Sequence, residues 1–346
     1  MHMTKNDMKR LIYAIVLFMA ILPGSARADS FNIEMVEDWG RFPKFCVKMY
    51  KLGNSLFNSY DTAYVVTHGM PFTIRPSIDL WGDTYDFKFP DNTKLNCVTT
   101  PFMSVGIKAQ FMALSYTYNI SINGKNRPGR QKNWSVGFSC SRFDLSLSIH
   151  NNEVGTRITN YTICGDQMFK NVMFPGLTNY VLAVEGLYIF NNRKYSRLAA
   201  FAMSKIQKKS SGSFFAGFKY DQHKATVDMG TLVGVPMDSL VQKLRFDNYH
   251  LSGGYGYNVV LGKGWIIGVQ DIVSLGLTRG QSQGYEKSSK FGFQNRLSMA
   301  IGWNRPRWFV NLQGCWNVCR YSESDFGMYE GYYTASLAVG YRFKLW

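Results

Sequence analysis

The strongest constraint on the fold is a two-residue alternation that fills the last hundred residues of the sequence. Large apolar side chains take nearly every second position in four long segments, and Gly, Ser, Ala, Asn and Gln take most of the positions between them. The apolar rows are Tyr249–Leu261, Phe291–Trp303, Trp308–Val318 and Tyr333–Leu345. Because successive side chains of a strand point to opposite faces, each segment predicts a strand with one apolar and one small or polar face.

Such an alternation fits either a water-soluble sandwich with one buried face or a barrel in a membrane. The strands run for 12 to 16 residues, which is long for a sandwich and suits a tilted crossing of a bilayer. The second face carries little charge, as a crowded or hydrated lumen requires, and aromatic residues gather near the segment ends, where a girdle at the lipid headgroups would lie. The sequence therefore predicts an all-β transmembrane antiparallel β-barrel.

The number of strands follows from the segments with this pattern. Thirteen segments qualify, but a single-chain bacterial barrel needs an even number. The weakest break is Gln207–Gly212, which can be a bulge within one longer strand, so we predict about 12 strands, with a range of 10–14. Tight reversals are expected at Asn191–Lys194, Gly262–Gly264 and Asn304–Arg307, with longer loops at the other end. The candidate segments are 72–89, 95–107, 111–121, 132–140, 143–155, 178–190, 195–206, 212–223, 245–261, 264–277, 290–303, 307–319 and 331–345.

The N-terminal region predicts export. A basic head at Lys9 and Arg10 precedes the apolar stretch Leu11–Leu22 and the small-x-small site Ala26–Ala28, which is the order of a secretory signal peptide over residues 1–28. Residues 29–70 then form a periplasmic N-terminal segment, and residues 71–346 form the barrel. Within 29–70, the apolar spacing over Pro43–Phe57 predicts a short amphipathic helix, packed on the periplasmic mouth or acting as a plug or a lipid-surface helix.

Composition limits the class of protein and its partners. The 346 residues include 16% aromatics and only 18% charged side chains, which excludes a disordered chain. Lys and Arg total 39 against 23 Asp and Glu, and for an exported protein this favours outer-membrane lipid, lipopolysaccharide or another anionic solute over nucleic acid. Cys315 and Cys319 lie too far apart on one strand to pair, whereas Cys46, Cys97, Cys140 and Cys164 are free to do so in an oxidising compartment.

Candidate chemistry in the strands is sparse. His250 and Ser252 share a strand face, the pairing that a barrel-embedded lipid hydrolase would use, but the alternation turns them inward and away from lipid. The histidines lack metal-ligand spacing, and no nucleotide motif is present, so we expect no metal or cofactor. Asp271 falls on the apolar face, which predicts either a bulge or a strand end outside the bilayer. Expected inward cations are Arg296, Arg342, Lys344, Arg75 and Arg197, with Glu185 as a possible partner.

Five stretches of the sequence stand out as motifs: Tyr188–Ser196, Ala199–Phe201, Gln207–Phe214, Tyr255–Asn258 and Gly340–Phe343. Together they resemble a family of Bacteroidetes outer-membrane proteins that is filed as a domain of unknown function. The resemblance implies a barrel in a Gram-negative envelope and assigns no activity. Its signature residues here are Asn191, Asn192, Ser196, Gln207, Lys208, Lys209, Ser210, Gly212 and Ser213. The final strand, with Tyr341 and Phe343 on one face, also resembles the C-terminal strand that the barrel-insertion machinery recognises.

These observations predict a non-enzymatic barrel of the outer membrane with a structural or envelope-binding role. A narrow pore with a basic lumen for small anionic solutes is the alternative, and a lipid hydrolase is the second alternative. Backbone amides and ammonium groups in Gln207–Ser213 could hold a phosphate or carboxylate, but the pattern favours a solvated turn over such a site. The candidate contacts with an anion or a lipid headgroup are Lys208, Lys209, Arg296 and Arg342.

Overall fold

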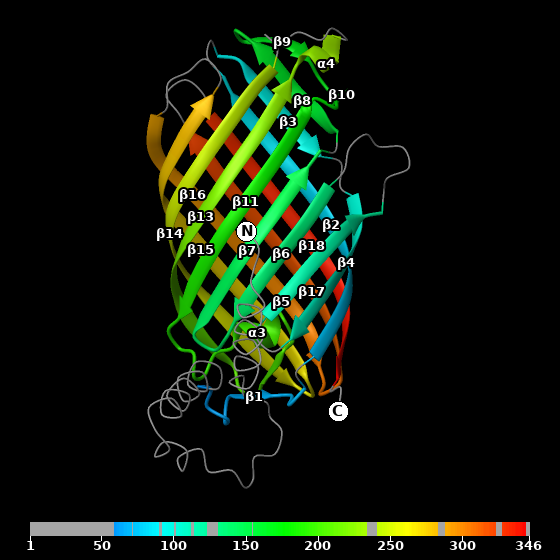
Figure 1. Cartoon of the computed structure of the whole chain (residues 1–346), viewed down its shortest axis with the longest axis vertical. Coiled ribbons are helices and arrows are strands. Elements are labelled where there is room, and N and C mark those ends of the chain that lie inside the picture. The colour runs from blue at the N-terminus through cyan, green and yellow to red at the C-terminus, as the bar shows by residue number, and fades with distance from the viewer. Residues whose placement is uncertain are drawn as a thin grey trace, which may run out of the picture.

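A single antiparallel sheet that closes on itself dominates the computed structural model (Figure 1). The sheet closes because β2 (Phe72–Lys88) pairs with β18 (Gly327–Phe343) on one side and with β4 (Phe102–Phe111) on the other. Among the described residues, no helix combines the length and hydrophobicity needed to cross a bilayer. The structure describes residues 59–70, 72–89, 92–99, 102–111, 114–122, 131–153, 155–233, 241–282, 288–322 and 327–343.

Twelve strands form the wall of the barrel, and their order around the ring follows their order in the chain. The prediction of about 12 strands is therefore confirmed. We call the end with the short turns at 262–264 and 304–307 the turn end, and the opposite end the loop end. Besides β2, β4 and β18, the wall contains β5 (Leu114–Ser121), β6 (Gln131–Ser139), β7 (Phe143–Asn152), β11 (Leu177–Ile189), β13 (Ser211–Asp228), β14 (Val241–Gly262), β15 (Trp265–Ser282), β16 (Ser288–Asn304) and β17 (Trp308–Ser322).

The alternation of the sequence is confirmed as an outward and an inward row on each long strand. On β14, Leu251 is 73% exposed, whereas its neighbours His250 and Ser252 are 0% and 6% exposed. The same contrast separates exposed Phe291 from the buried inward residues of β16. A wall whose outer face is apolar and whose inner face is small or polar suits a barrel with hydrocarbon outside.

One predicted strand is wrong. Residues 195–206 do not join the wall; they contain the single-turn helix α3 (Arg197–Ala200) and the first two residues of the short strand β12 (Lys205–Gln207). Leu198, Ala199 and Ala200 are all buried, and three consecutive buried residues do not fit a strand that faces lipid on one side. The even strand number therefore arises because this segment leaves the wall, not because a bulge at Gln207–Gly212 joins two segments.

A small sheet extends the wall at the loop end, and the sequence pattern did not reveal it. The segment predicted as one strand at 95–107 is two elements: β3 (Lys94–Thr99), which belongs to this extension, and the wall strand β4. β3 pairs with the upper part of β2 and with β8 (Thr156–Ile163), and β8 pairs with β9 (Asp166–Phe169) and β10 (Val172–Phe174). The helix α4 (Gly230–Val233) lies beside them at the top of Figure 1.

The remaining expectations have mixed outcomes. The short turns at 262–264 and 304–307 join wall strands as predicted, whereas the turn at 191–194 leads away from the wall, so it is not a tight hairpin. The register of β15 is continuous through Asp271, which faces outward, so of the two alternatives expected there the bulge is wrong. The signal peptide, the Pro43–Phe57 helix and Lys344 lie outside the described residues.

Candidate functional site

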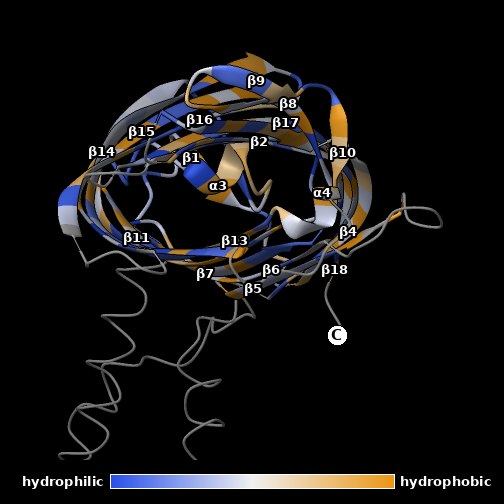
Figure 2. Ribbon diagram, turned by 90° about the horizontal axis from the view of Figure 1, so that it is seen from above, coloured by the Kyte–Doolittle hydropathy of each residue, from blue (hydrophilic) through white to orange (hydrophobic). Residues whose placement is uncertain are grey.

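The turn end of the barrel is closed by a plug made from two separate segments, residues 59–70 and 190–210. We call these segments the turn-end plug. The strand β1 (Val65–Thr67) pairs antiparallel with β12, which joins the two segments into one unit. Seen along the barrel axis, β1 and α3 lie inside the ring of wall strands (Figure 2).

Inward side chains and backbone from much of the wall hold this plug in place. Arg342 of β18 donates to the Met203 carbonyl and, at 2.8 Å, to Asn304 Oδ1. Arg75 Nη1 donates to the Phe201 carbonyl at 3.0 Å. Further bonds run from Asn258 to Ser196, from Asn304 to Lys205, from Asn311 to Ala200, and from Arg197 to Gln270 and Asp144. The plug is thus tied to β2, to β7 and to every strand from β14 to β18.

The family signature residues account for the shape of the plug. Gln207 is buried and accepts from the Ser196 amide at 3.1 Å and from Asn258 Nδ2 at 2.9 Å. Its own Nε2 donates to the Lys194 carbonyl at 2.9 Å. Asn191 Nδ2 donates to the Gly212 carbonyl at 2.8 Å, and its amide donates to Ser213 Oγ at 2.9 Å. These side chains fix where the chain leaves β11, turns inward and returns to β13.

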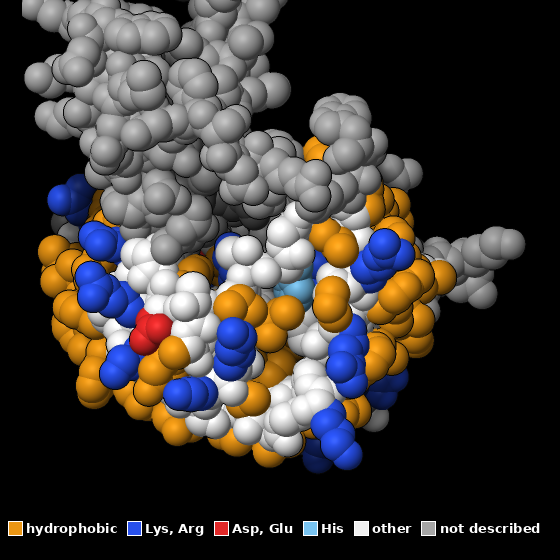
Figure 3. All heavy atoms as spheres, turned by 90° about the horizontal axis from the view of Figure 1, so that it is seen from below, with side chains coloured by type: hydrophobic (Ala, Val, Ile, Leu, Met, Phe, Trp, Pro, Cys, Tyr) orange, Lys and Arg blue, Asp and Glu red, His pale blue; other side chains and the backbone are white. Residues whose placement is uncertain are grey.

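Of the other signature residues, Asn192 is buried, whereas Lys208, Lys209 and Ser210 lie on the outer surface of the plug. Asn192 Nδ2 donates to Ser59 Oγ at 2.6 Å, and Ser210 Oγ accepts from the Val260 amide at 2.9 Å. Lys208 is exposed, with its Nζ 3.1 Å from the Thr62 carbonyl, and exposed Lys209 lies over the ring of Tyr64. Figure 3 shows further Lys and Arg side chains spread over this face. Anion binding by Lys208 and Lys209 stays a prediction.

His68 is the titratable group most affected by the plug. Its imidazole is largely enclosed, and the cationic side chains of Arg342 and Lys205 are nearby. Burial first, and then these two positive charges, lower the pKa of His68 from 6.5 to about 3. The docked plug therefore holds His68 neutral at ordinary pH.

The loop end is closed by an apolar cluster that we call the loop-end cap. The cap draws on the wall and on the β3–β8–β10 extension, so side chains from both parts pack together over the mouth. Met229 and Leu232 from the α4 region pack against it. Its buried members are Tyr85, Phe87, Leu95, Cys97, Ile158, Phe174, Leu177, Ala225, Val227, Leu244, Phe246, Cys319, Tyr321 and Met328.

Between the cap and the plug, hydrogen-bonded polar side chains fill the lumen. The ring of His223 lies between two carboxylates: its Nε2 is 3.2 Å from Asp221 Oδ2, and its Nδ1 is 3.1 Å from Glu330 Oε2. The Tyr321 hydroxyl is 2.9 Å from the same Nε2, and Asn179 Nδ2 donates to Glu330 Oε1 at 2.8 Å. All five residues are buried. Protein side chains therefore occupy the lumen at this level.

The predicted inward cations are present, and those in the described residues use their donors inside the protein. Arg296 Nη2 is 2.8 Å from both carboxylate oxygens of Glu185, which confirms the expected partner. Arg342 is buried among carbonyl oxygens at the plug. The structure thus separates Arg296, in the middle of the lumen, from Arg342 and from Lys208 and Lys209 at the turn end. These four residues do not form one site.

His250 and Ser252, the two residues considered for catalysis, do not hydrogen-bond to each other. His250 and Ser252 point inward, as predicted, but Ser252 Oγ pairs with Ser274 Oγ at 2.8 Å. Neither ring nitrogen of His250 has a hydrogen-bond partner in the described part of the chain. Across the same described ranges, His, Cys, Asp and Glu side chains nowhere gather as a set of three metal ligands. The described cysteines, Cys97, Cys140, Cys164, Cys315 and Cys319, are free thiols.

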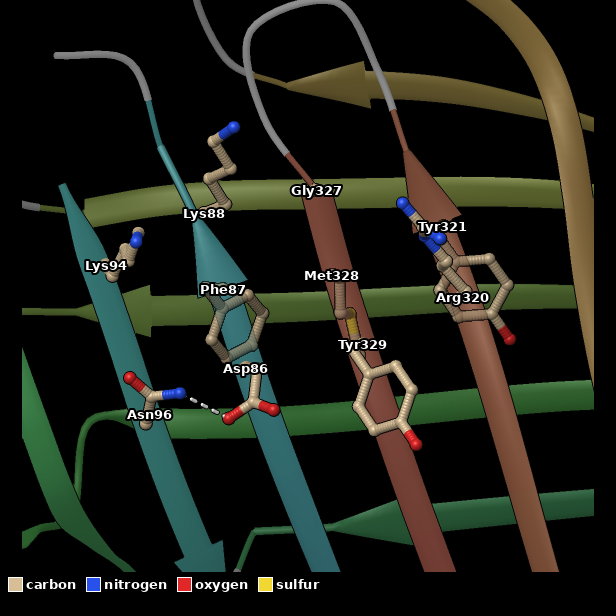
Figure 4. A pocket seen from close by; sticks show the side chains of 10 residues that line it. All are labelled: Asp86, Phe87, Lys88, Lys94, Asn96, Arg320, Tyr321, Gly327, Met328 and Tyr329. Atoms are coloured by element: carbon tan, nitrogen blue, oxygen red, sulfur yellow. Dashed lines mark hydrogen bonds between the residues drawn. The ribbon is translucent and has the colours of Figure 1, made fainter. Parts of the chain in front are cut away.

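The outer surface at the loop end carries a hollow of about 280 Å³, which we call the rim groove (Figure 4). Strand register builds it from two cross-strand rows. In the first row, Asn96 of β3, Asp86 of β2, Tyr329 of β18 and Arg320 of β17 are successive partners. The second row contains Lys94, Lys88 and Gly327. Because Gly327 has no side chain, space is left between the two rows.

The rim groove is cationic. Lys88, Lys94 and Arg320 are exposed, and none of them forms a salt bridge to another described residue. The one acidic side chain is Asp86, whose Oδ1 accepts from Asn96 Nδ2. The outward rows that continue toward the turn end from these strands are apolar, as Trp316 and Leu337 illustrate at 59% and 50% exposure. The groove therefore lies at the loop end, just beyond the apolar outward rows.

Sequence reasoning missed this groove because Arg320 lies far along the chain from Lys88 and Lys94, and it comes near them only through the pairing of β17 with β18 and of β18 with β2. A usable signal did exist: Arg320 has the same parity as the lipid-facing Trp316 and Val318 and lies just beyond them. Outward cations at the loop ends of strands would have pointed to headgroups. Their assembly into one groove depends on the register of four strands.

Comparison with known proteins gives a family match and distant structural likenesses. A family model described as Domain of unknown function (DUF4421) matches residues 59–343. No curated protein sequence matches this chain. The outer membrane protease OmpT from Escherichia coli is 9% identical, with a TM-score of 0.37, and the match covers 79% of this chain and 97% of that one.

Two further solved structures are similar at the same level. The β-domain of the Bordetella autotransporter BrkA is 12% identical, with a TM-score of 0.39, over 78% of this chain and 100% of that one. The Pseudomonas putida toluene transporter TodX is 7% identical, with a TM-score of 0.26, over 79% and 90%. At such identities and scores, these likenesses carry no argument about activity.

Proposed function

This chain belongs to the family described as Domain of unknown function (DUF4421), and from that premise we propose that it is an outer-membrane barrel with a binding role. The barrel does not conduct solutes, and it binds phosphate-bearing lipid at its outer rim. The role is non-enzymatic. The turn end faces the periplasm, because short turns lie on that side in barrels of this kind, and the loop end faces out.

The rim groove is the observation that carries the binding role. Three cations, Lys88, Lys94 and Arg320, line a hollow that lies directly above lipid-facing rows. Phosphate oxygens accept charge-assisted hydrogen bonds from Lys and Arg, and Arg can bind them in a bidentate manner. The lipid that carries phosphates at that height in the outer leaflet is lipopolysaccharide, through its lipid A.

The filled lumen supports the absence of conduction. The turn-end plug, the polar side chains around His223 and the loop-end cap follow one another along the barrel axis. A narrow anion pore would need cations that are free to meet a solute, whereas Arg296, Arg342, Arg197 and Arg75 are bonded to carboxylates, amide oxygens or carbonyls. These contacts favour the binding role over the pore.

Retention of lipid A on the purified, delipidated protein tests the proposal. Native mass spectrometry would compare diphosphoryl, monophosphoryl and dephosphorylated lipid A, using the natural chain and the triple variant Lys88→Gln, Lys94→Gln, Arg320→Gln. At about 1 kcal/mol per cation, the triple variant should lose about 100-fold in affinity at low salt. Binding should also weaken with each phosphate removed.

A matched control uses three exposed cations of the turn end, in the variant Lys263→Gln, Arg305→Gln, Arg307→Gln. This control should retain lipid A as the natural chain does. Equal retention of the dephosphorylated lipid, or an equal loss in the control variant, would contradict the proposal.

A further inference from the structure

The lipid-facing wall carries a polar pair far from the rim groove, formed by Asp271 of β15 and Asn295 of β16. Asn295 Nδ2 donates to Asp271 Oδ1 at 2.7 Å on the outer surface of the barrel. The strands pair without interruption through both residues, so the pair is not the product of a bulge. Register places Asp271 opposite Tyr255 and Leu297.

The pair lies near the middle of the apolar band. The outward row of β15 starts at Trp265, reaches Asp271 six residues later, and continues through Leu275 and Leu277 to Arg279. With a strand rise of about 3.3 Å and a tilt of about 45°, Asp271 lies roughly 14 Å above the Trp265 level. A band about 25 Å tall therefore has this carboxyl group near its centre, where polar side chains are costly and commonly have a function.

The wall does not use the full bonding capacity of the pair. An Asn side chain has two N–H donors and a carbonyl acceptor, and a carboxylate accepts several hydrogen bonds. Within the described part of the chain, the Asp271 and Asn295 side chains hydrogen-bond to each other and to no other residue. One N–H of Asn295 and most of the acceptor sites of Asp271 thus face outward, where lipid tails offer no partner.

We propose that this surface, the Asp271–Asn295 patch, binds a second copy of the chain within the membrane. Two barrels of equal topology are related by a two-fold axis along the membrane normal, so each residue meets the other copy at the same height. The two-fold rotation reverses the lateral order of the two residues, so the facing patch presents Asp271 and Asn295 in the opposite order. Asn295 of each copy then comes opposite Asp271 of the other, and the spare N–H of each amide meets the spare acceptors of each carboxyl group. The patch is therefore self-complementary, as an isologous interface requires.

A small residue beside the patch allows two walls to approach closely. Gly253 of β14 is the partner of Val273, which in turn lies beside Asn295, and a side chain at Gly253 would meet nothing within 4 Å. In membranes, small residues let two protein surfaces approach closely, so that packing contacts and hydrogen bonds can form between them.

Disulfide cross-linking in lipid vesicles tests this inference. In a chain whose native cysteines are replaced by Ser, Val273→Cys would place a thiol beside the patch, and oxidation should yield a covalent dimer. The matched control is Val105→Cys on β4, an outward position that is 48% exposed on another part of the wall. It should give at least tenfold less dimer. Addition of Asp271→Leu to Val273→Cys should reduce the dimer by a similar factor.

A second experiment keeps the natural cysteines, so it does not depend on whether the cysteine-free chain folds. Sedimentation in density-matched detergent should show a dimer for the natural chain and a monomer for both Asp271→Leu and Asn295→Leu. Heat-modifiable gel mobility would confirm that each variant is a folded barrel. A monomeric natural chain, equal cross-linking at Val105→Cys, or a dimer that persists in Asp271→Leu would each overturn the inference.

Discussion

The Arg296–Glu185 ion pair shows how single residues of the inner face stabilise the barrel. The two side chains come from β16 and β11, which are not neighbours in the sheet, so the pair connects parts of the wall across the lumen. The side chains are 24% and 10% exposed. Loss of one partner would leave the other charge without a counter-charge in a confined space, and such a charge is costly.

Substitution of Arg296 tests this role. The variant Arg296→Met should lower the free energy of unfolding by about 3–5 kcal/mol, because it leaves the buried Glu185 carboxylate without a counter-charge. The double variant Arg296→Met, Glu185→Leu should recover much of that loss, since neither charge remains. Urea-dependent folding into lipid vesicles would measure both, with Arg305→Met on the exposed turn end as a control near the natural value. A double variant no more stable than the single one would refute this account of the pair.

His68 predicts a dependence of plug stability on pH. Its pKa is about 3 when the plug is docked and 6.5 when the group is free, so the undocked form takes up a proton that the docked form resists. The stability from this group is therefore complete above pH 6.5 and is lost progressively as the pH falls toward 3. The thermal midpoint of the natural chain should decrease between pH 7 and pH 4.5 by more than that of His68→Gln. Parallel midpoints in the two proteins would contradict this assignment.

At the scale of elements, the turn-end plug departs most from the sequence pattern. A strand prediction at 195–206 treated its apolar residues as lipid-facing, whereas Leu198, Ala199 and Ala200 pack inside the ring. An apolar side chain can be covered either by lipid or by protein. The sequence pattern alone therefore could not distinguish a lipid-facing strand from a segment packed inside the barrel. By contrast, the signature around Asn191 and Gln207 did mark the plug, although its purpose becomes visible only in the hydrogen bonds.

Replacement of residues 195–206 by a short Gly-Ser linker should open the turn end. Cys315 faces the lumen from β17 and is a free thiol, so it reports on access from this end. In a chain with Cys315 and Cys164 as the two remaining cysteines, a water-soluble maleimide should label Cys315 at least about tenfold faster after the replacement. Cys164 is exposed in both proteins and should label at one rate, which makes it an internal control. An unchanged rate at Cys315 would mean that the plug does not shield the lumen.

At the scale of the molecule, the sequence predicted the wall well and its two ends poorly. The wall follows a local rule, since alternation over 12 or more residues fixes which side chains face lipid. The loop-end cap and the rim groove depend on which strands become neighbours, and residues as distant as Lys88 and Arg320 meet only through β18. Local patterning contains no information on that register, so both features emerge only in the closed barrel.

Single-channel recording across a planar lipid bilayer tests the central claim, a transmembrane barrel whose lumen is sealed by its own side chains. Heat-modifiable mobility of the reconstituted protein would first establish that folded barrels are present in the membrane. The filled lumen between the plug and the cap predicts a flat current, with no unitary steps at either polarity. Steady, anion-selective steps from the natural chain would contradict the claim and would favour a pore with a basic lumen.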